Sequence, residues 1–275
     1  MTVLPTTTAT RPAPRPATAP ATGPFVGAVA AEWTKLRSVR STWWTVLAAA
    51  LTMAATSGQL AIYAVNANTD DDPTVNPGIL PVGDIVTGSL ELTQYVVLAL
   101  GLFAITSEYA TGTIRTTLRC TPSRTRVLLA KAVVVGGLTF LLGLLLGGIG
   151  AAVARPVLGE WGRAPLGGTL ADVAASAAYL ALVGVLALGL AAALRSPVLT
   201  LTVLLALLMI VPLSLQEPGI TVLTRIADAF PGVAGGHFLA GDTDPYPAAV
   251  GLLLLAGWTA GGLALGRWAL ARRDA

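Results

Sequence analysis

Six long apolar runs, which carry almost no charged residues, divide this chain of 275 residues. Each run is long enough, or nearly so, to cross the hydrocarbon core of a bilayer as a helix, which takes about 20 residues. Charged residues make up 11% of the chain, against about 25% in a soluble domain. We therefore predict an all-α integral membrane protein with six transmembrane helices. The runs are Trp43–Val65, Ile85–Thr106, Val127–Ala154, Val173–Leu194, Val198–Leu215 and Pro247–Ala269.

The basic residues are sorted between the two sides of these predicted spans. With the N-terminus inside, 14 of the 17 Lys and Arg residues fall on the inner side, and the exceptions are Arg155, Arg163 and Arg225. Basic residues collect on the cytoplasmic side, so both termini are predicted to be cytoplasmic. Orientation and attraction to anionic lipid explain the net charge of +3, and no nucleic-acid partner is expected. Arginine outnumbers lysine fifteen to two, which favours a high-GC bacterium and its plasma membrane.

The first 24 residues differ in composition from the rest of the chain. They are rich in Thr, Pro and Ala. No apolar stretch precedes Phe25, so the segment is not typical of a secretory signal peptide. Its composition is typical of disorder. We predict a disordered cytoplasmic tail over residues 1–24 and a single six-span membrane domain over residues 25–275.

The segment before the first span predicts an amphipathic helix over Val26–Trp44, lying in the inner membrane interface. Its apolar residues recur at helical spacing and its polar residues fall mainly on the other side, whereas Glu32 and Arg40 fit this pattern less well. Tryptophans suit headgroup depth, and cations suit anionic lipid. The alternative is an ordinary positively charged flank of the first span. The candidate residues of this interfacial helix are Glu32, Trp33, Lys35, Leu36, Arg37 and Arg40.

The segment Ser107–Lys131, between the second and third spans, is the most unusual part of the chain. Gly112 allows a turn, Thr113 can cap a short helix through its hydroxyl, and Pro122 would end that helix. The apolar face would fit a groove in a soluble partner, and the basic face would meet carboxylates there. The alternative is a positively charged loop without a partner. Each face is an i, i+4 pair: Ile114 with Leu118, and Arg115 with Arg119.

Two stretches resemble one known family. Residues 108–118, Glu-Tyr-Ala-Thr-Gly-Thr-Ile-Arg-Thr-Thr-Leu, look like the cytoplasmic loop of bacterial ABC exporter permeases of the type-2 (drug/polysaccharide) class. Residues 32–44, Glu-Trp-Thr-Lys-Leu-Arg-Ser-Val-Arg-Ser-Thr-Trp-Trp, resemble the interfacial helix of the same family. The six-span layout, an outer helix before the last span and the Arg-Arg-Asp-Ala end are also similar. The resemblance covers residues 25–275.

This resemblance implies a permease subunit that forms a homo- or heterodimer and couples to separate cytoplasmic ATPase subunits. In the family, the interfacial helix and the loop after the second span contact the nucleotide-binding subunit. The residues to which the resemblance carries that role are Glu32, Lys35, Arg37, Glu108, Gly112, Thr113 and Arg115. The full candidate coupling loop comprises Glu108, Tyr109, Gly112, Thr113, Ile114, Arg115, Leu118 and Arg119. Substrates vary within the family, so the resemblance names none.

The chain has no phosphate-binding motif of its own. No Gly-x-x-x-x-Gly-Lys-[Ser/Thr] occurs, and neither lysine, Lys35 or Lys131, follows a glycine. We therefore expect no enzyme activity and no directly bound cofactor, with ATP and Mg held by the partner subunit. Two other classes stay open. One is an ion- or proton-driven secondary transporter, and the other is a non-transporting immunity or scaffold protein of the membrane.

Polar residues inside the second span are the candidate substrate path. A buried carboxylate is costly there, so Glu91 should face protein or water, and Gln94 lies one turn away on the same side. Either the two line a path at the dimer interface, or Glu91 is wetted by headgroups. His237, the only histidine, lies in a predicted outer loop. A metal site needs more ligands, so none is predicted.

Two further patterns bear on packing. A short helix over Ile220–Phe230, ended by Pro231, is predicted on the outer membrane face. Glycines four residues apart let helices approach closely. Such pairs therefore predict which faces of the helices pack against a neighbour. The pairs are Gly143 with Gly147, Gly257 with Gly261, and Gly262 with Gly266.

Overall fold

The computed structural model describes residues 24–70, 76–120, 123–241 and 243–272, and nearly all of them are helical. The predicted tail lies outside the described residues, apart from Pro24. Two short strands pair in parallel, with Leu80 beside Gly162. In chain order the elements are α1 (Pro24–Ser38), α2 (Arg40–Thr69), β1 (Leu80–Pro81), α3 (Val82–Thr111), α4 (Ile114–Cys120), α5 (Arg124–Leu158), η1 (Gly159–Trp161), β2 (Gly162–Arg163), α6 (Leu166–Leu194), α7 (Pro197–Leu205), η2 (Ala206–Ile210), α8 (Val211–Gln216), α9 (Thr221–Ala227), α10 (Pro231–Ala240) and α11 (Ala248–Arg272).

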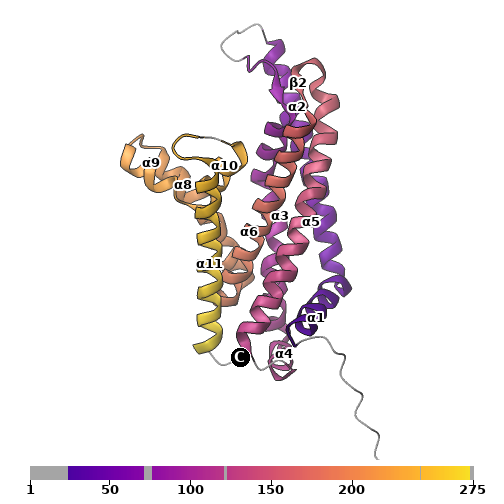
Figure 1. Cartoon of the computed structure of the whole chain (residues 1–275), viewed down its shortest axis with the longest axis vertical. Coiled ribbons are helices and arrows are strands. Elements are labelled where there is room, and N and C mark those ends of the chain that lie inside the picture. Colours follow the sequence, from indigo (N-terminus) through magenta and orange to yellow (C-terminus); the bar gives the residue numbers. More distant parts are fainter. Residues whose placement is uncertain (1–23, 71–75, 121–122, 242, 273–275) are drawn as a thin grey trace, which may run out of the picture.

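Within the described residues, six helical stretches are long and apolar enough to cross a membrane, which confirms the predicted fold class. They are α2, α3, α5 with η1, α6, the α7–η2–α8 stretch and α11. Figure 1 shows α1, α4 and the C-terminal end of α11 together at one end of the bundle, which we call the α4 end. The strands β1 and β2 lie at the opposite end, where α2 and α5 extend past the level of α8, α9 and α10.

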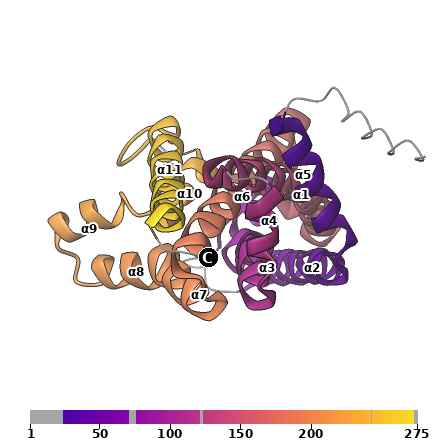
Figure 2. The same ribbon diagram turned by 90° about the horizontal axis from the view of Figure 1, so that it is seen from below.

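The central helix of the bundle is α6. Figure 2 shows it between a group formed by α2, α3 and α5 and a second group formed by α7, α8 and α11. Its residues 186–192 are all buried, and most are small or unbranched at Cβ. Small side chains let neighbouring helices approach closely. In a bilayer, where the hydrophobic effect does not drive helices together, such close packing is what holds them.

Glycines set the distance between α6 and its neighbours. A Cβ atom on Gly101 of α3 would lie 2.3 Å from the carbonyl oxygen of Gly184, and one on Gly143 of α5 would lie 2.5 Å from the Cα of Ala177. Two of the predicted pairs therefore do mark packing faces, and the third faces open space. The pairs against α6 are Gly143 with Gly147 and Gly262 with Gly266, and the open pair is Gly257 with Gly261.

The fifth span contains a π-helical turn, η2, just before Pro212. Proline has no N–H, so it cannot donate to the carbonyl of the residue four positions earlier, here Leu208. Gly232 of α10 packs closely on that carbonyl, because a Cβ at Gly232 would lie 1.9 Å from the Leu208 oxygen. The irregular turn therefore coincides with the site where α10 rests on the span.

The segment between the fifth and sixth spans holds two helices rather than the single one predicted. The first, α9, falls inside the predicted range Ile220–Phe230 and confirms it. Pro231, read from the sequence as the end of that helix, instead occupies the first turn of α10. Proline suits the first helical position because its N–H would be unpaired there anyway. His237 consequently lies on α10 and not in a loop, with its ring packed edge-on against Tyr246.

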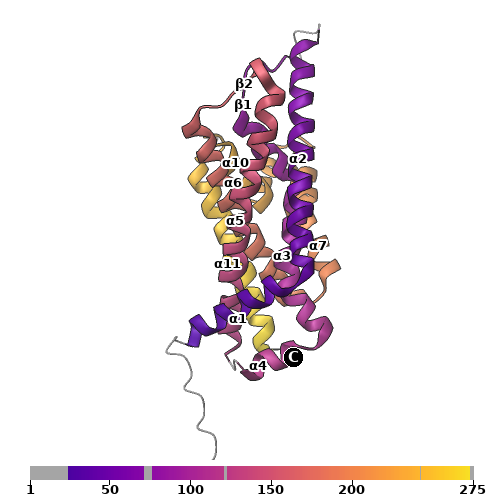
Figure 3. The ribbon, with the colours of Figure 1, turned by 90° about the vertical axis from the view of Figure 1, so that its right-hand side faces the viewer.

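The predicted helix over Val26–Trp44 is two helices, and this part of the prediction was wrong. The backbone of Val39 is extended, with φ −86° and ψ 121°, and separates α1 from α2. The Trp43 indole N–H donates to the Arg37 carbonyl across the break, at 3.1 Å. Figure 3 shows α1 lying across the lower ends of α2 and α5 rather than continuing α2. Arg40 and Trp43 therefore belong to the first span.

Candidate functional site

The loop after the second span folds into a turn and one short helix at the α4 end. Gly112 closes α3 in the left-handed conformation, with φ +71°, and its N–H donates to the Tyr109 carbonyl at 3.3 Å. This confirms the turn predicted at Gly112, where a glycine adopts positive φ at little cost. The Thr113 hydroxyl lies 2.9 Å from that of Thr111. The end of α4 at Pro122 lies outside the described residues.

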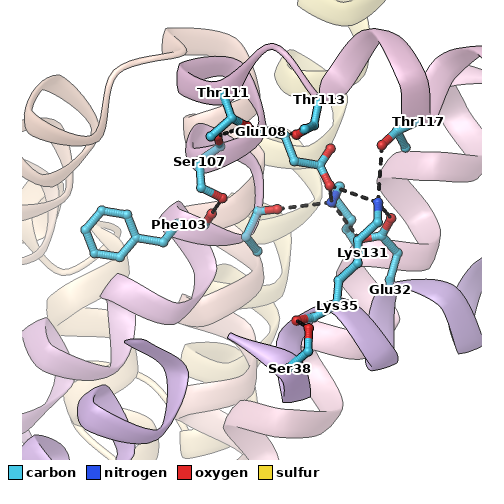
Figure 4. Close-up of polar contacts among 11 residues, drawn as sticks. Glu32, Lys35, Ser38, Phe103, Ser107, Glu108, Thr111, Thr113, Thr117 and Lys131 are labelled. Carbon is cyan, nitrogen blue, oxygen red and sulfur yellow. Dashed lines mark hydrogen bonds and ion pairs between the residues drawn. The ribbon is translucent and has the colours of Figure 1, made fainter. Parts of the chain in front are cut away.

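A cluster of two carboxylates and two ammonium groups joins this loop to α1 and α5 (Figure 4). We call Glu32, Lys35, Glu108 and Lys131 the ion cluster. Lys131 Nζ lies 2.6 Å from Glu32 Oε2 and 2.8 Å from Glu108 Oε1. Lys35 Nζ lies 2.8 Å from Glu32 Oε1 and 3.0 Å from Glu108 Oε1. Both lysines of the chain therefore meet at one point.

Burial explains why the charges are paired. The Lys131 side chain is 2% exposed and those of Glu32 and Glu108 are 8% and 10% exposed. Buried charges of this kind persist only when they are matched and hydrogen-bonded. Two positive and two negative groups make the ion cluster neutral. Lys131 also donates to the Ala104 carbonyl at 3.0 Å, so all three of its N–H donors are used.

Lys35 differs from Lys131 because its side chain is 44% exposed. Partial burial disfavours its charge, but hydrogen bonds and attraction from Glu32 and Glu108 outweigh that effect and raise the pKa of its ammonium above the ordinary value. Its third donor reaches the Thr117 hydroxyl of α4 at 3.2 Å. Lys35 thus bonds to α3 and α4 while it sits on α1.

The ion cluster therefore ties three helices together at the α4 end, and a hydrogen bond from Lys35 to Thr117 adds α4. Glu32 and Lys35 come from α1, Glu108 from the last turns of α3, Lys131 from α5, and Thr117 from α4. Motion of α1 relative to α3 and α5 would separate buried charges. Because such separation is costly, these three helices should move as one unit, and α4 is joined to them by the hydrogen bond from Lys35 to Thr117.

The remaining loop residues divide into buried and exposed groups. Ile114 is 3% exposed. This side chain, which was predicted to fit a groove in a partner, therefore packs inside its own chain. Arg115 and Arg119 are exposed on α4. Tyr109 packs beneath Arg195 in the turn between α6 and α7, with the guanidinium carbon 4.8 Å from the ring centre. The side chain of Leu118 lies outside the described residues.

The candidate residues of the interfacial helix also differ in their exposure to solvent. Glu32 is buried in the ion cluster, which explains why it did not fit the amphipathic pattern. Trp33 and Arg37 are exposed, and Leu36 is half-buried. Arg40 is exposed in the first turn of α2 rather than on α1.

The two residues of the candidate path do not share an environment. Glu91 is exposed on α3, whereas Gln94 is buried and accepts a hydrogen bond from the Tyr179 hydroxyl of α6. The Gln94 amide N–H in turn donates to the Glu91 carbonyl at 3.0 Å. Within the described ranges, no Lys or Arg lies within ion-pair distance of Glu91. Gln94 therefore contributes to the packing of α3 against α6. Of the two residues, only Glu91 faces the outside of this chain.

Sequence reasoning missed the part of the site that Lys131 supplies. Lys131 lies 99 positions from Glu32 in the sequence, so no local pattern pairs the two residues. A scan against protein-family models gives no match for this chain, and a search of curated proteins gives none.

Proposed function

We propose that this chain is the membrane-spanning permease subunit of an ATP-binding-cassette exporter, coupled at its α4 end to separate ATPase subunits. Two copies, or this chain and a related one, would form the substrate path between them. ATP and Mg would be bound by the ATPase. The six membrane-crossing helices are consistent with a transporter of this kind. The observation that carries the proposal is the ion cluster.

The ion cluster supports a coupling role because of the helices it connects. A partner that pressed on exposed α4 or on α1 would act on Thr117 and Lys35, which are bonded to each other. Lys35 passes the displacement to α3 through Glu108, and Glu32 passes it to α5 through Lys131. Spans two and three would therefore shift together. A stroke delivered at the surface would in this way reach helices that cross the membrane.

The arginines support a cytoplasmic position for the α4 end. Basic residues concentrate on the cytoplasmic side of membrane proteins. Away from the α4 end the described basic residues are few, namely Arg155, Arg163 and Arg225. A bacterial plasma membrane would place the α4 end next to cytoplasmic ATPases.

A secondary transporter would make a different use of buried charge. Such carriers place ionisable groups near the middle of the membrane, where they bind the coupling ion. Here the paired charges lie at the last turns of α3 and the beginning of α5. That location favours mechanical coupling over ion translocation. Flux from the purified chain alone, driven by a proton or ion gradient, would support the carrier instead.

The coupling proposal predicts that Arg115→Glu weakens association with the ATPase. Arg115 is exposed on α4, and reversing its charge would place like charges opposite each other at the proposed contact. The tagged chain would be purified from its native host, and the bound ATPase identified and quantified by mass spectrometry. We expect at least a tenfold loss of bound ATPase, because like-charge juxtaposition across an interface costs several kcal/mol.

Arg225→Glu is the matched control. Arg225 is exposed on α9, far along the chain from α4, and its reversal should leave ATPase recovery unchanged. The proposal fails if Arg115→Glu retains wild-type ATPase association and transport. Recovery of the wild-type chain without any ATPase would favour the immunity or scaffold class.

A further inference from the structure

A cavity of about 550 Å³ opens beside the ion cluster, among α1, α2, α3, α4 and α5. Eight of the eighteen residues that line it are serines or threonines. Apolar side chains, among them Leu36, Leu100 and Phe103, form another part of its wall. Figure 4 shows Phe103, Ser107 and Thr111 succeeding one another along α3 toward the turn that leads to α4. A cavity with both kinds of wall suits an amphiphile.

The charged residues of the cavity wall are the four members of the ion cluster, and they bond to one another. Both lysines donate to both carboxylates, and each gives its third N–H to another acceptor. An ammonium group has three donors, so both lysines are saturated. The Oε2 atom of Glu108, which has no hydrogen-bond partner among the described residues, is enclosed by protein and lies out of a ligand's reach. A head group of either charge would therefore find no free counter-charge here.

Hydroxyl groups are what the cavity offers to a ligand. Thr42 of α2 lines the cavity and is 8% exposed, and within the described part of the chain its hydroxyl makes no hydrogen bond. A buried polar group without a partner is costly. The hydroxyls of Thr45 on α2 and Ser107 on α3 donate to carbonyls of their own helices, at 2.9 Å and 2.6 Å, and retain lone pairs for another donor. A ligand hydroxyl, which both donates and accepts, matches this set.

The cavity lies at the depth expected of the membrane interface. The first turns of α2 form one of its walls and also carry Trp43 and Trp44, which are exposed. Tryptophan gathers at membrane–water interfaces. Two apolar residues of the wall, Val39 and Phe103, are about half-exposed, so the protein does not seal the apolar part. A ligand with an apolar chain can therefore enter from the bilayer with its head at the level of the hydroxyls.

We propose that this cavity binds an uncharged amphiphile whose head carries hydroxyl groups, with a monoacylglycerol as its simplest bilayer example. The head bonds to the hydroxyls of Thr42, Thr45 and Ser107. The acyl chain lies along Leu100 and Phe103. An uncharged head leaves the ion cluster undisturbed, whereas an ionised head would lose its water without gaining a counter-charge. This inference does not depend on the proposed coupling to an ATPase.

The test compares ligands that share an oleoyl chain and differ in the head group. Monooleoylglycerol, methyl oleate and oleoyl lysophosphatidic acid would be titrated onto the purified full chain in lauryldimethylamine oxide, a detergent without hydroxyl groups, and bound ligand counted by native mass spectrometry. We expect monooleoylglycerol to bind about tenfold more tightly than either of the others, because methyl oleate has no hydroxyl and the phosphate must lose its water. Equal or tighter binding of either comparison ligand would overturn the proposal. Glycerol, which lacks the acyl chain, should not compete, and competition by it would assign the cavity to a soluble polyol instead.

One variant places the binding in this cavity. Thr42→Val keeps the branched shape of the side chain but removes the hydroxyl, so monooleoylglycerol should bind at least about threefold more weakly. The affinity for methyl oleate should not change, which shows that the cavity persists in the variant. Thr56→Val is the matched control, because Thr56 also lies on α2 and is also 8% exposed but does not line the cavity. A wild-type preference for monooleoylglycerol in Thr42→Val would refute the assignment to this cavity.

Discussion

Replacing Lys131 by methionine is expected to destabilise the protein by about 3–5 kcal/mol, the cost of removing one partner from a buried ion pair. Glu32 and Glu108 would keep their charges in a buried site with only the half-exposed Lys35 between them. This is a large fraction of the stability of most proteins, which is about 5–15 kcal/mol. Equilibrium unfolding in detergent would measure the loss. Proteolysis near Val39 would show whether α1 separates from the bundle.

Lys35→Met is the matched control, because both lysines contact the same two carboxylates. The Lys35 side chain is 44% exposed, so water already screens its charge, and its loss should cost about 1 kcal/mol or less. Adding Glu108→Gln to Lys131→Met removes one charge of each sign and should recover part of the loss. Equal costs for the two lysine variants would show that burial of the ion cluster does not govern its energetics.

Replacing Gly189 by alanine is expected to destabilise the contact between α6 and α11 by about 1–3 kcal/mol, the usual cost of overpacking. The new Cβ atom would lie 2.5 Å from the Gly262 carbonyl carbon and 2.7 Å from the Leu263 nitrogen. Both are backbone atoms, so no side-chain rotation can relieve the clash and the two helices must move apart. The melting temperature in detergent should fall.

Gly261→Ala, on α11, is the control for Gly189→Ala, and we expect it not to lower the melting temperature. A Cβ at Gly261 meets no atom within 4 Å, so the change brings only the gain in helix propensity, up to about 1 kcal/mol. Its melting temperature should be unchanged or higher. A melting temperature for Gly189→Ala at or above that of the wild type would mean that α6 and α11 are not held together by close backbone contact.

The six spans could be predicted because hydropathy depends only on local composition. Breaks within helices could not be predicted in the same way. Nothing in Ser38-Val39-Arg40 is a helix breaker, and the break at Val39 depends on where α1 packs against α5. Pro231 was ambiguous for a related reason, since proline both ends helices and begins them. Only the surrounding fold decides between those two roles.

The ion cluster could be predicted only in part. Lys35 and Glu32 are three residues apart, which is an ordinary helical pair. Lys131 joins them because α5 passes beside α1, and no local pattern encodes that contact. Two signals were nevertheless present in the sequence. Glu32 interrupted an amphipathic pattern, and lysine occurs only twice in a chain that otherwise uses arginine.

The scarcity of lysine has an experimental consequence. Amine-reactive reagents have only two lysine side chains to modify, one half-exposed at Lys35 and one enclosed at Lys131. The extent of acylation at Lys131, with Lys35 as an internal standard, would therefore report how often the interior of the four-charge assembly becomes accessible. The native chain thus contains its own chemical reporter of conformational opening, without any engineered label.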